Sequence, residues 1–484
     1  MLHRITVLPE GQVIEAPSGD TLLCAMGAAA LTVDAPCGGD GRCGKCLVRV
    51  DGNPVLACQT LVDRDMTVTL PLPGEQKILT EQTLPLELAD SCQGGYQLAF
   101  DVGTTTVVGY LLEGKSGREL AVAGAQNPQA ACGADVITRI RHGLQGQMEA
   151  LGSSIRHCLG DLTSQMCRQA GVLAEDIRLV CAVGNPAMQQ FLLGIPVDNL
   201  AKVPFAPVLK QMHTIPAREV LPLWKNAEFL VVPDIAGFVG ADTLACILAC
   251  RQDEQEKMTL LVDIGTNGEM VLGNGQRMVA CSAAAGPALE GALIQFGMRG
   301  QTGAIDHVWL EKDQIRCSVI GGGKAQGICG SGLIDAAAVA LEQGLINERG
   351  KVLTEDGLLH LTDSIFLTQE DIRQLQLAKG AIAAGIRLMA SHMGIALSDI
   401  QSVYLAGAFG TYMDPKSACR IGLLPSELEA KITAVGNAAG RGAQILACSA
   451  QARQRAQQIL SRTQALELST LPEFSRCFAK QMRF

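Results

Sequence analysis

The stretch that decides the fold is Leu260-Leu261-Val262-Asp263-Ile264-Gly265-Thr266-Asn267-Gly268-Glu269-Met270-Val271, because an earlier stretch repeats its plan: Leu98-Ala99-Phe100-Asp101-Val102-Gly103-Thr104-Thr105-Thr106-Val107-Val108. Each copy is an apolar strand, an Asp-x-Gly-Thr motif and a second strand, which is the pattern of a hairpin closed by a tight glycine turn. The copies lie about 160 residues apart, as expected of an internal duplication. One motif alone would be weak evidence, but the pair predicts two related α/β lobes.

The chemistry of these turns indicates phosphate binding. Glycine allows the backbone to come close to a phosphate, and threonine hydroxyls and turn N–H groups can donate to phosphate oxygens. An aspartate at the end of each strand, Asp101 or Asp263, can hold Mg²⁺ through water molecules. Two such hairpins facing each other would clamp a triphosphate.

A third glycine-rich site is Val403-Tyr404-Leu405-Ala406-Gly407-Ala408-Phe409-Gly410, which predicts a strand followed by a turn of close approach. The three sites together resemble the two phosphate motifs and the adenosine motif of the ASKHA superfamily (actin, sugar kinases and Hsp70). The resemblance implies a two-lobed ATPase that binds ATP and Mg²⁺. The sequence contains no Walker A pattern and no Rossmann fingerprint.

Other small-residue segments carry weaker signals. Gly327–Asp335, with Gly330, Ser331 and Gly332, predicts a loop entering a helix whose N–H groups could bind an anion. Asp234 and Glu290 are further candidates for nucleotide contact. Close helix packing is the alternative explanation for each of these segments. Cys246 and Cys250 have helical spacing and are interpreted as core thiols.

The N-terminal 75 residues indicate a small α+β unit with strands at 4–8, 12–15, 47–50 and 66–70 and a helix at 22–30. A glycine-rich loop within it carries three of four cysteines spaced C-x5-C-x2-C-x11-C, namely Cys37, Cys43, Cys46 and Cys58. Four thiolates complete the coordination of two iron atoms, and the pattern resembles the β-grasp [2Fe–2S] ferredoxins. A structural zinc site is the alternative, although zinc sites favour two C-x2-4-C pairs.

Composition restricts the remaining function classes. The 484 residues carry a net charge of −9 with no basic block, which argues against nucleic acid as a partner. We find neither a signal peptide nor an apolar stretch long enough to span a membrane, so we expect a cytoplasmic protein. Breaker residues from Pro71 onward predict a linker. The expected division is a ferredoxin domain at 1–73, a linker at 74–95, and ATPase lobes at 96–259 and 260–484.

The order of motifs along the chain resembles the reductive activators of corrinoid proteins, which fuse a ferredoxin domain to an ASKHA ATPase. The motifs are the ferredoxin loop, Phe100–Thr106, Gly184–Pro186, Asp234–Asp242, Asp263–Glu269, Gly286–Gly291, Ile328–Asp335, Leu405–Gly410 and the tail Leu471–Phe484. The resemblance covers nearly the whole chain. The chain is shorter than the longer members of this family, which raises the expectation of a missing or reduced intermediate domain. Cys448 and Cys477 are isolated, so a single-cluster type is implied.

This resemblance implies that the four loop cysteines hold the electron source and that Mg-ATP drives reduction of an inactive cobalt(II) corrinoid to cobalt(I). Asp101 and Asp263 would then position Mg²⁺ and water. The implied nucleotide contacts are the phosphate residues Gly103, Thr104, Thr105, Thr106, Gly265, Thr266 and Asn267, and the adenosine-side residues Gly407, Ala408, Phe409 and Gly410.

The implied partners are a corrinoid protein of a methyltransferase system and a reducing electron donor. We find no Asp-x-His-x-x-Gly motif, because Asp306-His307 lacks the following glycine, so the corrinoid is expected on the partner. The oligomeric state stays open, a homodimer included. Other functions that stay open are an ATP-driven donor to another low-potential enzyme, a small-molecule kinase with a fused redox domain, and a nucleotide-switched scaffold.

Overall fold

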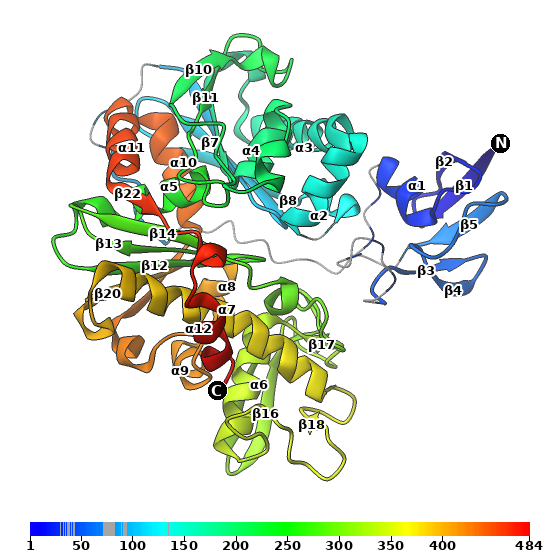
Figure 1. Ribbon diagram of the computed structural model, residues 1–484. Helices are drawn as coiled ribbons and strands as arrows, with labels where there is room; N and C mark the ends of the chain where they lie inside the picture. Colours follow the sequence, from blue (N-terminus) through cyan, green and yellow to red (C-terminus); the bar gives the residue numbers. More distant parts are fainter. Residues whose placement is uncertain are drawn as a thin grey trace.

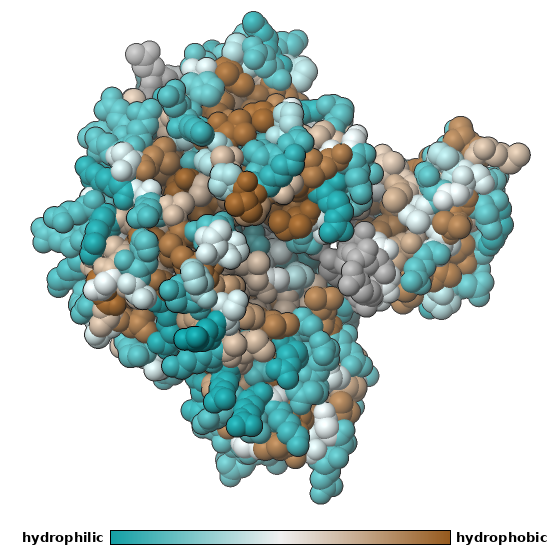
Figure 2. Space-filling view, in the orientation of Figure 1, coloured by the Kyte–Doolittle hydropathy of each residue, from teal (hydrophilic) through white to brown (hydrophobic). Residues whose placement is uncertain are grey.

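The computed structural model describes residues 1–29, 31, 33, 35, 39, 41, 44–70, 83–88, 90, 94–133 and 135–484. Figure 1 shows a small N-terminal domain beside two larger α/β lobes, with the N-terminus at the far edge of the small domain. In the space-filling view of Figure 2 the small domain projects from the side of the two lobes. Within these described ranges, no helix is long and apolar enough to cross a membrane.

The N-terminal domain is a five-stranded sheet with strand order β2-β1-β5-β3-β4. Its strands are β1 (Leu2–Leu8), β2 (Gln12–Pro17), β3 (Leu47–Val50), β4 (Asn53–Leu56) and β5 (Met66–Thr69). Helix α1 (Leu22–Ala28) begins after Thr21, whose hydroxyl accepts from the Cys24 N–H. The predicted hairpin, helix and later strands are confirmed, and β4 is an additional strand whose Asn-Pro start hid it.

The first lobe is built on a six-stranded sheet of order β10-β11-β9-β6-β7-β8. The strands are β6 (Tyr96–Val102), β7 (Thr106–Glu113), β8 (Glu119–Gln126), β9 (Ile177–Gly184), β10 (His213–Pro216) and β11 (Glu228–Val231). Its helices are α2 (Val136–His142), α3 (Met148–Ala170), α4 (Pro186–Leu193) and α5 (Ala241–Ala249), with the 3-10 helix η1 at Pro128–Cys132. The predicted hairpin around the first Asp-x-Gly-Thr motif is the antiparallel pair β6–β7.

The second lobe repeats this plan with a sheet of order β21-β20-β12-β13-β14-β22. The strands are β12 (Thr259–Ile264), β13 (Gly268–Gly273), β14 (Met278–Ala283), β20 (Ser402–Ala406), β21 (Ile432–Gly436) and β22 (Thr463–Ala465). The second Asp-x-Gly-Thr motif joins β12 to β13 in the predicted antiparallel hairpin. Each sheet thus contains an antiparallel meander, β6-β7-β8 or β12-β13-β14, whose first strand also pairs in parallel with a later strand, β9 or β20, which explains the sequence repeat.

Helices and two small sheets complete the second lobe. The helices are α6 (Gly330–Glu342), α7 (Gln369–Met393), α8 (Gly407–Tyr412), α9 (Pro415–Arg420), α10 (Ala438–Cys448), α11 (Ala450–Arg462) and α12 (Phe474–Gln481). The small sheets contain β15 (Ala304–Glu311), β16 (Gln314–Val319) and β17 (Gly327–Ile328), and β18 (Leu359–His360) with β19 (Phe366–Leu367). Figure 1 shows the long helix α7 running across this lobe, with α12 against it at the C-terminus.

The two sheets share one hydrophobic core. Helices α5 and α10 pack against each other, and α10 also contacts β6 and β9 of the first lobe. The core around them takes buried residues from both sheets, among them Ala99 and Tyr110 from the first and Leu261 and Val271 from the second. Removing this much apolar surface from water couples the lobes at the base of the cleft between them.

The described part of the predicted linker is anchored on the lobes and is therefore not a free tether. Leu84, Leu86 and Leu88 pack against the shared core. Asp90 accepts hydrogen bonds from the N–H groups that begin α11. Residues 74–82, 89 and 91–93 of the predicted linker lie outside the described residues.

The ferredoxin-like domain contacts both lobes. Helix α1 lies against η1 of the first lobe, where a β-carbon on Gly27 would come within 3.0 Å of the Ala131 Cβ. On the other side, the Lys45 ammonium donates to the carbonyls of Ile294 (3.2 Å) and Gly297 (2.7 Å) in the second lobe. The residue that makes this second contact directly precedes Cys46.

Candidate functional site

The two Asp-x-Gly-Thr turns meet at one cavity of about 570 Å³ between the lobes. The two turns that the sequence predicts as phosphate-binding therefore lie together in space, although they are far apart in sequence. The predicted residues that line the cavity are Asp101, Gly103, Thr104, Thr105, Thr106, Asp263, Gly265, Thr266 and Asn267.

Four of the carboxylates that line this cavity have a raised pKa, and burial is the main cause for each of them. Loss of hydration raises the pKa of Asp101 and Asp242 to about 7 and that of Asp263 to about 6. It also raises the pKa of Glu269 well above its ordinary value. The neighbouring carboxylates add to the shift of Asp101, while a hydrogen bond from Asn437 opposes it. Such a concentration of acids favours a cation.

The acids fit a metal ion that is bound partly by other ligands. Among the residues that the structure describes, no three Asp, Glu, His or Cys side chains lie close enough together to hold one metal ion directly. Mg²⁺ normally keeps several waters and is bound through one or two carboxylates plus substrate phosphates. Asp101 and Asp263 therefore stay candidates for an ion that would arrive with a nucleotide.

The hydroxyls of the two turns converge on one further carboxylate. Thr105 donates to both oxygens of Glu290 at 3.0 Å, and Thr266 donates to Oε1 at 2.7 Å. Nearby, the buried Arg139 donates to the Thr104 carbonyl at 2.7 Å, which helps to fix the backbone of the first turn. Burial lowers the pKa of Arg139 to about 10, so its guanidinium stays charged at neutral pH.

Helices α6 and α8 form another part of the cavity wall. Gly330, Ser331, Gly407 and Phe409 line it. The expected close approach at Gly407 is directed at the carboxylate of the second turn. With φ at +81°, a β-carbon there would lie 2.5 Å from the Asp263 Oδ1. The predicted turn after β20 is thus the start of the short helix α8.

Three other predicted contacts are placed elsewhere. Gly332 packs against the Ile305 carbonyl, and Gly410 packs against Leu405. The Asp234 carboxylate is buried in the first lobe, where it accepts from the Gln189 amide at 2.9 Å. The Ala408 side chain lies outside the described part of the structure.

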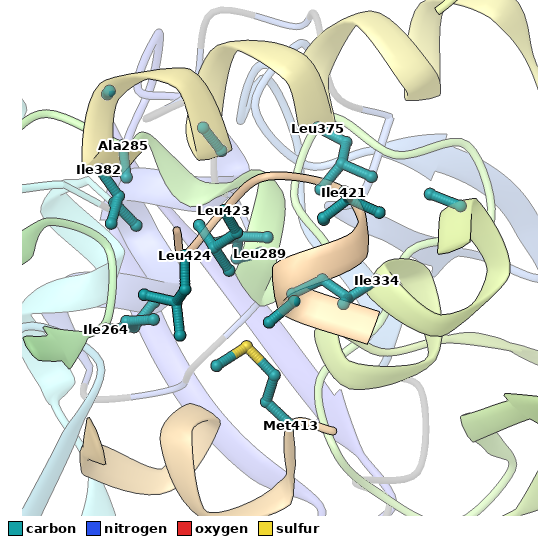
Figure 3. Close-up of a cluster of buried hydrophobic side chains, with 14 of the residues drawn as sticks. Ile264, Ala285, Leu289, Ile334, Leu375, Ile382, Met413, Ile421, Leu423 and Leu424 are labelled. Atoms are coloured by element: carbon teal, nitrogen blue, oxygen red, sulfur yellow. The ribbon is translucent and has the colours of Figure 1, made fainter. Parts of the chain in front are cut away.

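A hydrophobic cluster beneath the cavity fixes the second turn and the neighbouring segment. Figure 3 shows Ile264 and Leu289 in the same cluster as Ile382, Leu423 and Leu424. Ile264 directly follows Asp263, and Leu289 directly precedes Glu290. Because both apolar neighbours are almost fully buried, the two carboxylates are held at defined positions.

In the N-terminal domain, Cys46 and Cys58 lie side by side with their sulfur atoms 3.3 Å apart. Both thiols are buried and belong to the hydrophobic core of the domain. This separation is far longer than a disulfide bond of about 2.05 Å and allows both sulfurs to bind neighbouring iron at one cluster. The other two predicted ligands, Cys37 and Cys43, lie outside the described residues.

The sequence did not single out four polar residues at or near the cavity between the lobes. Asp242 and Glu269 lay inside quoted motifs but had no assigned role, and Arg139 and Asn437 had no motif at all. The one usable signal was the position of Glu269 two residues after Asn267, opposite Asp263 in the predicted hairpin. Cys246, interpreted as a core thiol, is buried and also lies 3.7 Å from the Asp263 Oδ2.

Family models match almost the whole chain. Residues 5–68 match the 2Fe-2S iron-sulfur cluster binding domain, residues 96–255 match the RACo middle region, and residues 257–484 match the C-terminal domain of RACo, the ASKHA domain. The family's middle region is therefore present, as the first lobe. The ASKHA match also implies nucleotide binding.

Individual relatives agree with these models. The chain is 36% identical over 418 residues to the corrinoid activation enzyme RamQ of Eubacterium limosum, which covers 80% of this chain and 70% of that protein. It is 35% identical over 254 residues to a [Co(II) methylated amine-specific corrinoid protein] reductase of Methanosarcina barkeri, covering 48% of this chain and 46% of the relative. A solved structure, the reductive activator for corrinoid,iron-sulfur protein, superposes with a TM-score of 0.72 at 27% identity over 100% of this chain and 98% of that one. The chain therefore belongs to the RACo family.

Proposed function

We propose that this chain is an ATP-dependent reductive activator, which passes one electron from a [2Fe–2S] cluster to the inactive cobalt(II) corrinoid of a partner methyltransferase system and so restores cobalt(I). The observation that carries the proposal is the union of two sites in one chain. A cavity with two phosphate-type turns and buried acids lies between the lobes, and a domain with paired buried thiols contacts both lobes.

The cysteines Cys37, Cys43, Cys46 and Cys58 would hold the cluster, which supplies the single electron when bound. Plant-type [2Fe–2S] centres have potentials of about −400 mV, so reduction of a more negative corrinoid couple is uphill without another energy source. Nucleotide binding can contribute that energy only if it favours one conformation of the chain over another. The two lobes are joined at the shared core and separated by the cavity, so such a change could be a rotation of one lobe against the other about that core.

The partner is inferred from the relatives, whose names describe action on corrinoid proteins. A corrinoid protein of a methylamine-type methyltransferase system is one such client. The electron that reaches cobalt must first be supplied to this chain, so a reducing donor protein is a second partner.

An anaerobic assay tests the proposal. The reduced chain is mixed with a cobalt(II) corrinoid protein, and the corrinoid spectrum is followed with and without Mg-ATP. Appearance of cobalt(I) only with Mg-ATP is expected. Cys46→Ser should abolish cobalt reduction and spare ATP hydrolysis, whereas Asp263→Ala should abolish both. If ATP is hydrolysed while every corrinoid partner stays at cobalt(II), the client is a different low-potential enzyme or a small molecule.

A further inference from the structure

The carboxylate of Glu290 stands where the two phosphate turns converge. It accepts hydrogen bonds from Thr105 of the first lobe and from Thr266 of the second lobe, at 3.0 and 2.7 Å. Each threonine hydroxyl carries one proton and can donate to one strong acceptor at a time, apart from weak sharing. Glu290 therefore uses the same donors that the turns would offer to a phosphate.

The position of Glu290 is built into the fold. It ends the 3-10 turn Pro287–Glu290, and the glycines on either side, Gly286 and Gly291, have φ of +75° and +81°. The preceding Leu289 is buried in the hydrophobic cluster of Figure 3. Its carbonyl oxygen lies so close to α6 that a β-carbon on Gly330 would come within 1.9 Å. Packing of Leu289 against the hydrophobic cluster and α6 thus fixes the turn, while the Glu290 side chain lies at the cavity.

We propose that Glu290 makes the site distinguish nucleoside triphosphate from diphosphate, by competing with the terminal phosphate for the Thr105 and Thr266 hydroxyls. This inference rests on the proposed nucleotide function. A terminal phosphate that takes these donors displaces the carboxylate and brings a second negative charge near it. Like charges at short distance in a partly buried site repel strongly. A diphosphate ends one phosphate earlier, so Glu290 keeps its two hydrogen bonds.

The same exchange changes how the lobes are joined. The Thr105–Glu290 hydrogen bond crosses the cleft, because Thr105 follows β6 of the first lobe and Glu290 follows β14 of the second. With a triphosphate bound, the phosphate takes over this connection, and with a diphosphate the direct bond is restored. Glu290 thereby gives the two nucleotides a differential interaction with the chain, which a nucleotide-driven change requires.

The test measures binding of two ligands to the full-length chain in the presence of Mg²⁺, with calorimetry as the readout. The ligands are a non-hydrolysable imido analogue of ATP and ADP. Glu290→Gln keeps the size of the side chain and removes its charge, and Glu290→Ala serves as a second variant. The control is Glu311→Gln, a half-exposed carboxylate that pairs with Arg316 on the β15–β16 hairpin of the same lobe.

We expect Glu290→Gln to bind the ATP analogue about tenfold more tightly relative to ADP than the wild type does, a factor that equals about 1.4 kcal/mol. The control should leave this ratio unchanged. Equal changes for both ligands, or a weaker preference for the ATP analogue in both Glu290 variants, would overturn the role of Glu290. Wild-type protein that binds neither ligand would overturn the proposed nucleotide function and this inference with it. If the wild-type protein binds both ligands but fails in the corrinoid assay, only the proposed corrinoid partner is wrong. The ratio of the affinities for the ATP analogue and ADP then still tests the role of Glu290.

Discussion

Replacing Asp101 with asparagine should make the chain more stable at alkaline pH, although this residue is part of the proposed Mg-nucleotide site. Burial raises the pKa of Asp101 from 3.8 to about 7. The folded chain therefore holds a proton at this carboxyl over a pH range in which the unfolded chain has lost it. Stability from this group is present in full below pH 3.8 and is lost as the pH rises through 7.

The size of the effect follows from that shift. One excess bound proton changes stability by about 1.4 kcal/mol per pH unit, so between pH 5 and pH 8 the wild type loses about 2.5 kcal/mol through Asp101. Asparagine has nearly the same shape and can still accept from Asn437, but it does not ionise. The melting temperature of the variant minus that of the wild type should therefore be larger at pH 8 than at pH 5. For a lobe of 150–250 residues, we expect this increase to be roughly 5–10 °C.

The assay is thermal unfolding of wild type and Asp101→Asn at both pH values, in buffer with a chelator and without nucleotide. Asp161→Asn is the matched control, because this aspartate is exposed on α3 of the same lobe. An offset that is the same at pH 5 and pH 8, or larger at pH 5, would refute the reasoning from burial. Mg-nucleotide should then stabilise the wild type more than the variant, since only the wild type has the carboxylate for the ion.

Three further predictions concern other parts of the site. Cys46→Ser should remove the visible absorption and the reduced-state electron paramagnetic resonance signal of the cluster, because this buried thiol adjoins a second one at 3.3 Å. Gly407→Ala should lower ATP hydrolysis by about a hundredfold, since its β-carbon would meet the Asp263 carboxylate at 2.5 Å, whereas Gly357→Ala, with a similar φ of +73° and open space, should cost only about 1–2 kcal/mol of stability. Lys45→Met should speed hydrogen exchange in the 291–300 segment by about ten- to a hundredfold, as expected for loss of charged hydrogen bonds worth about 1.5–3 kcal/mol, and unchanged exchange would show that the contact contributes nothing.

Much of this organisation could be predicted because local patterns encode it. Strand, turn and strand around Asp101 and Asp263 follow from apolar runs broken by glycine, and the structure confirms both hairpins. That the two turns share one cavity could be inferred only from the repeat, since 162 residues separate the two aspartates. The repeat is informative because each hairpin needs its partner to bury its own apolar face.

The residues that could not be predicted owe their position to packing between distant segments. Arg139 has no motif, yet it lies beneath the first turn because α2 returns the chain to the Thr104 carbonyl. Asp242 lies inside the quoted motif Asp234–Asp242 but had no assigned role, and its raised pKa arises from burial, with the charge of Asp263 adding to it. The glycine-rich pattern also led us to expect that Gly332 and Gly410 contact the nucleotide. In the structure these two glycines instead leave room for the neighbouring residues Ile305 and Leu405.

The contacts of the N-terminal domain indicate where nucleotide binding can affect an electron donor. Helix α1 lies on η1 of the first lobe, and Lys45 binds two carbonyls of the second lobe. The domain between these contacts is a packed sheet with its own core, so it moves as a unit. A change in the angle between the lobes would move these two contact points relative to each other, and the domain would then shift against at least one lobe. Since Lys45 directly precedes Cys46, any such shift also changes what surrounds a proposed ligand of the cluster. On the proposed function, these contacts would connect the nucleotide's preference for one lobe arrangement to the site that gives up the electron.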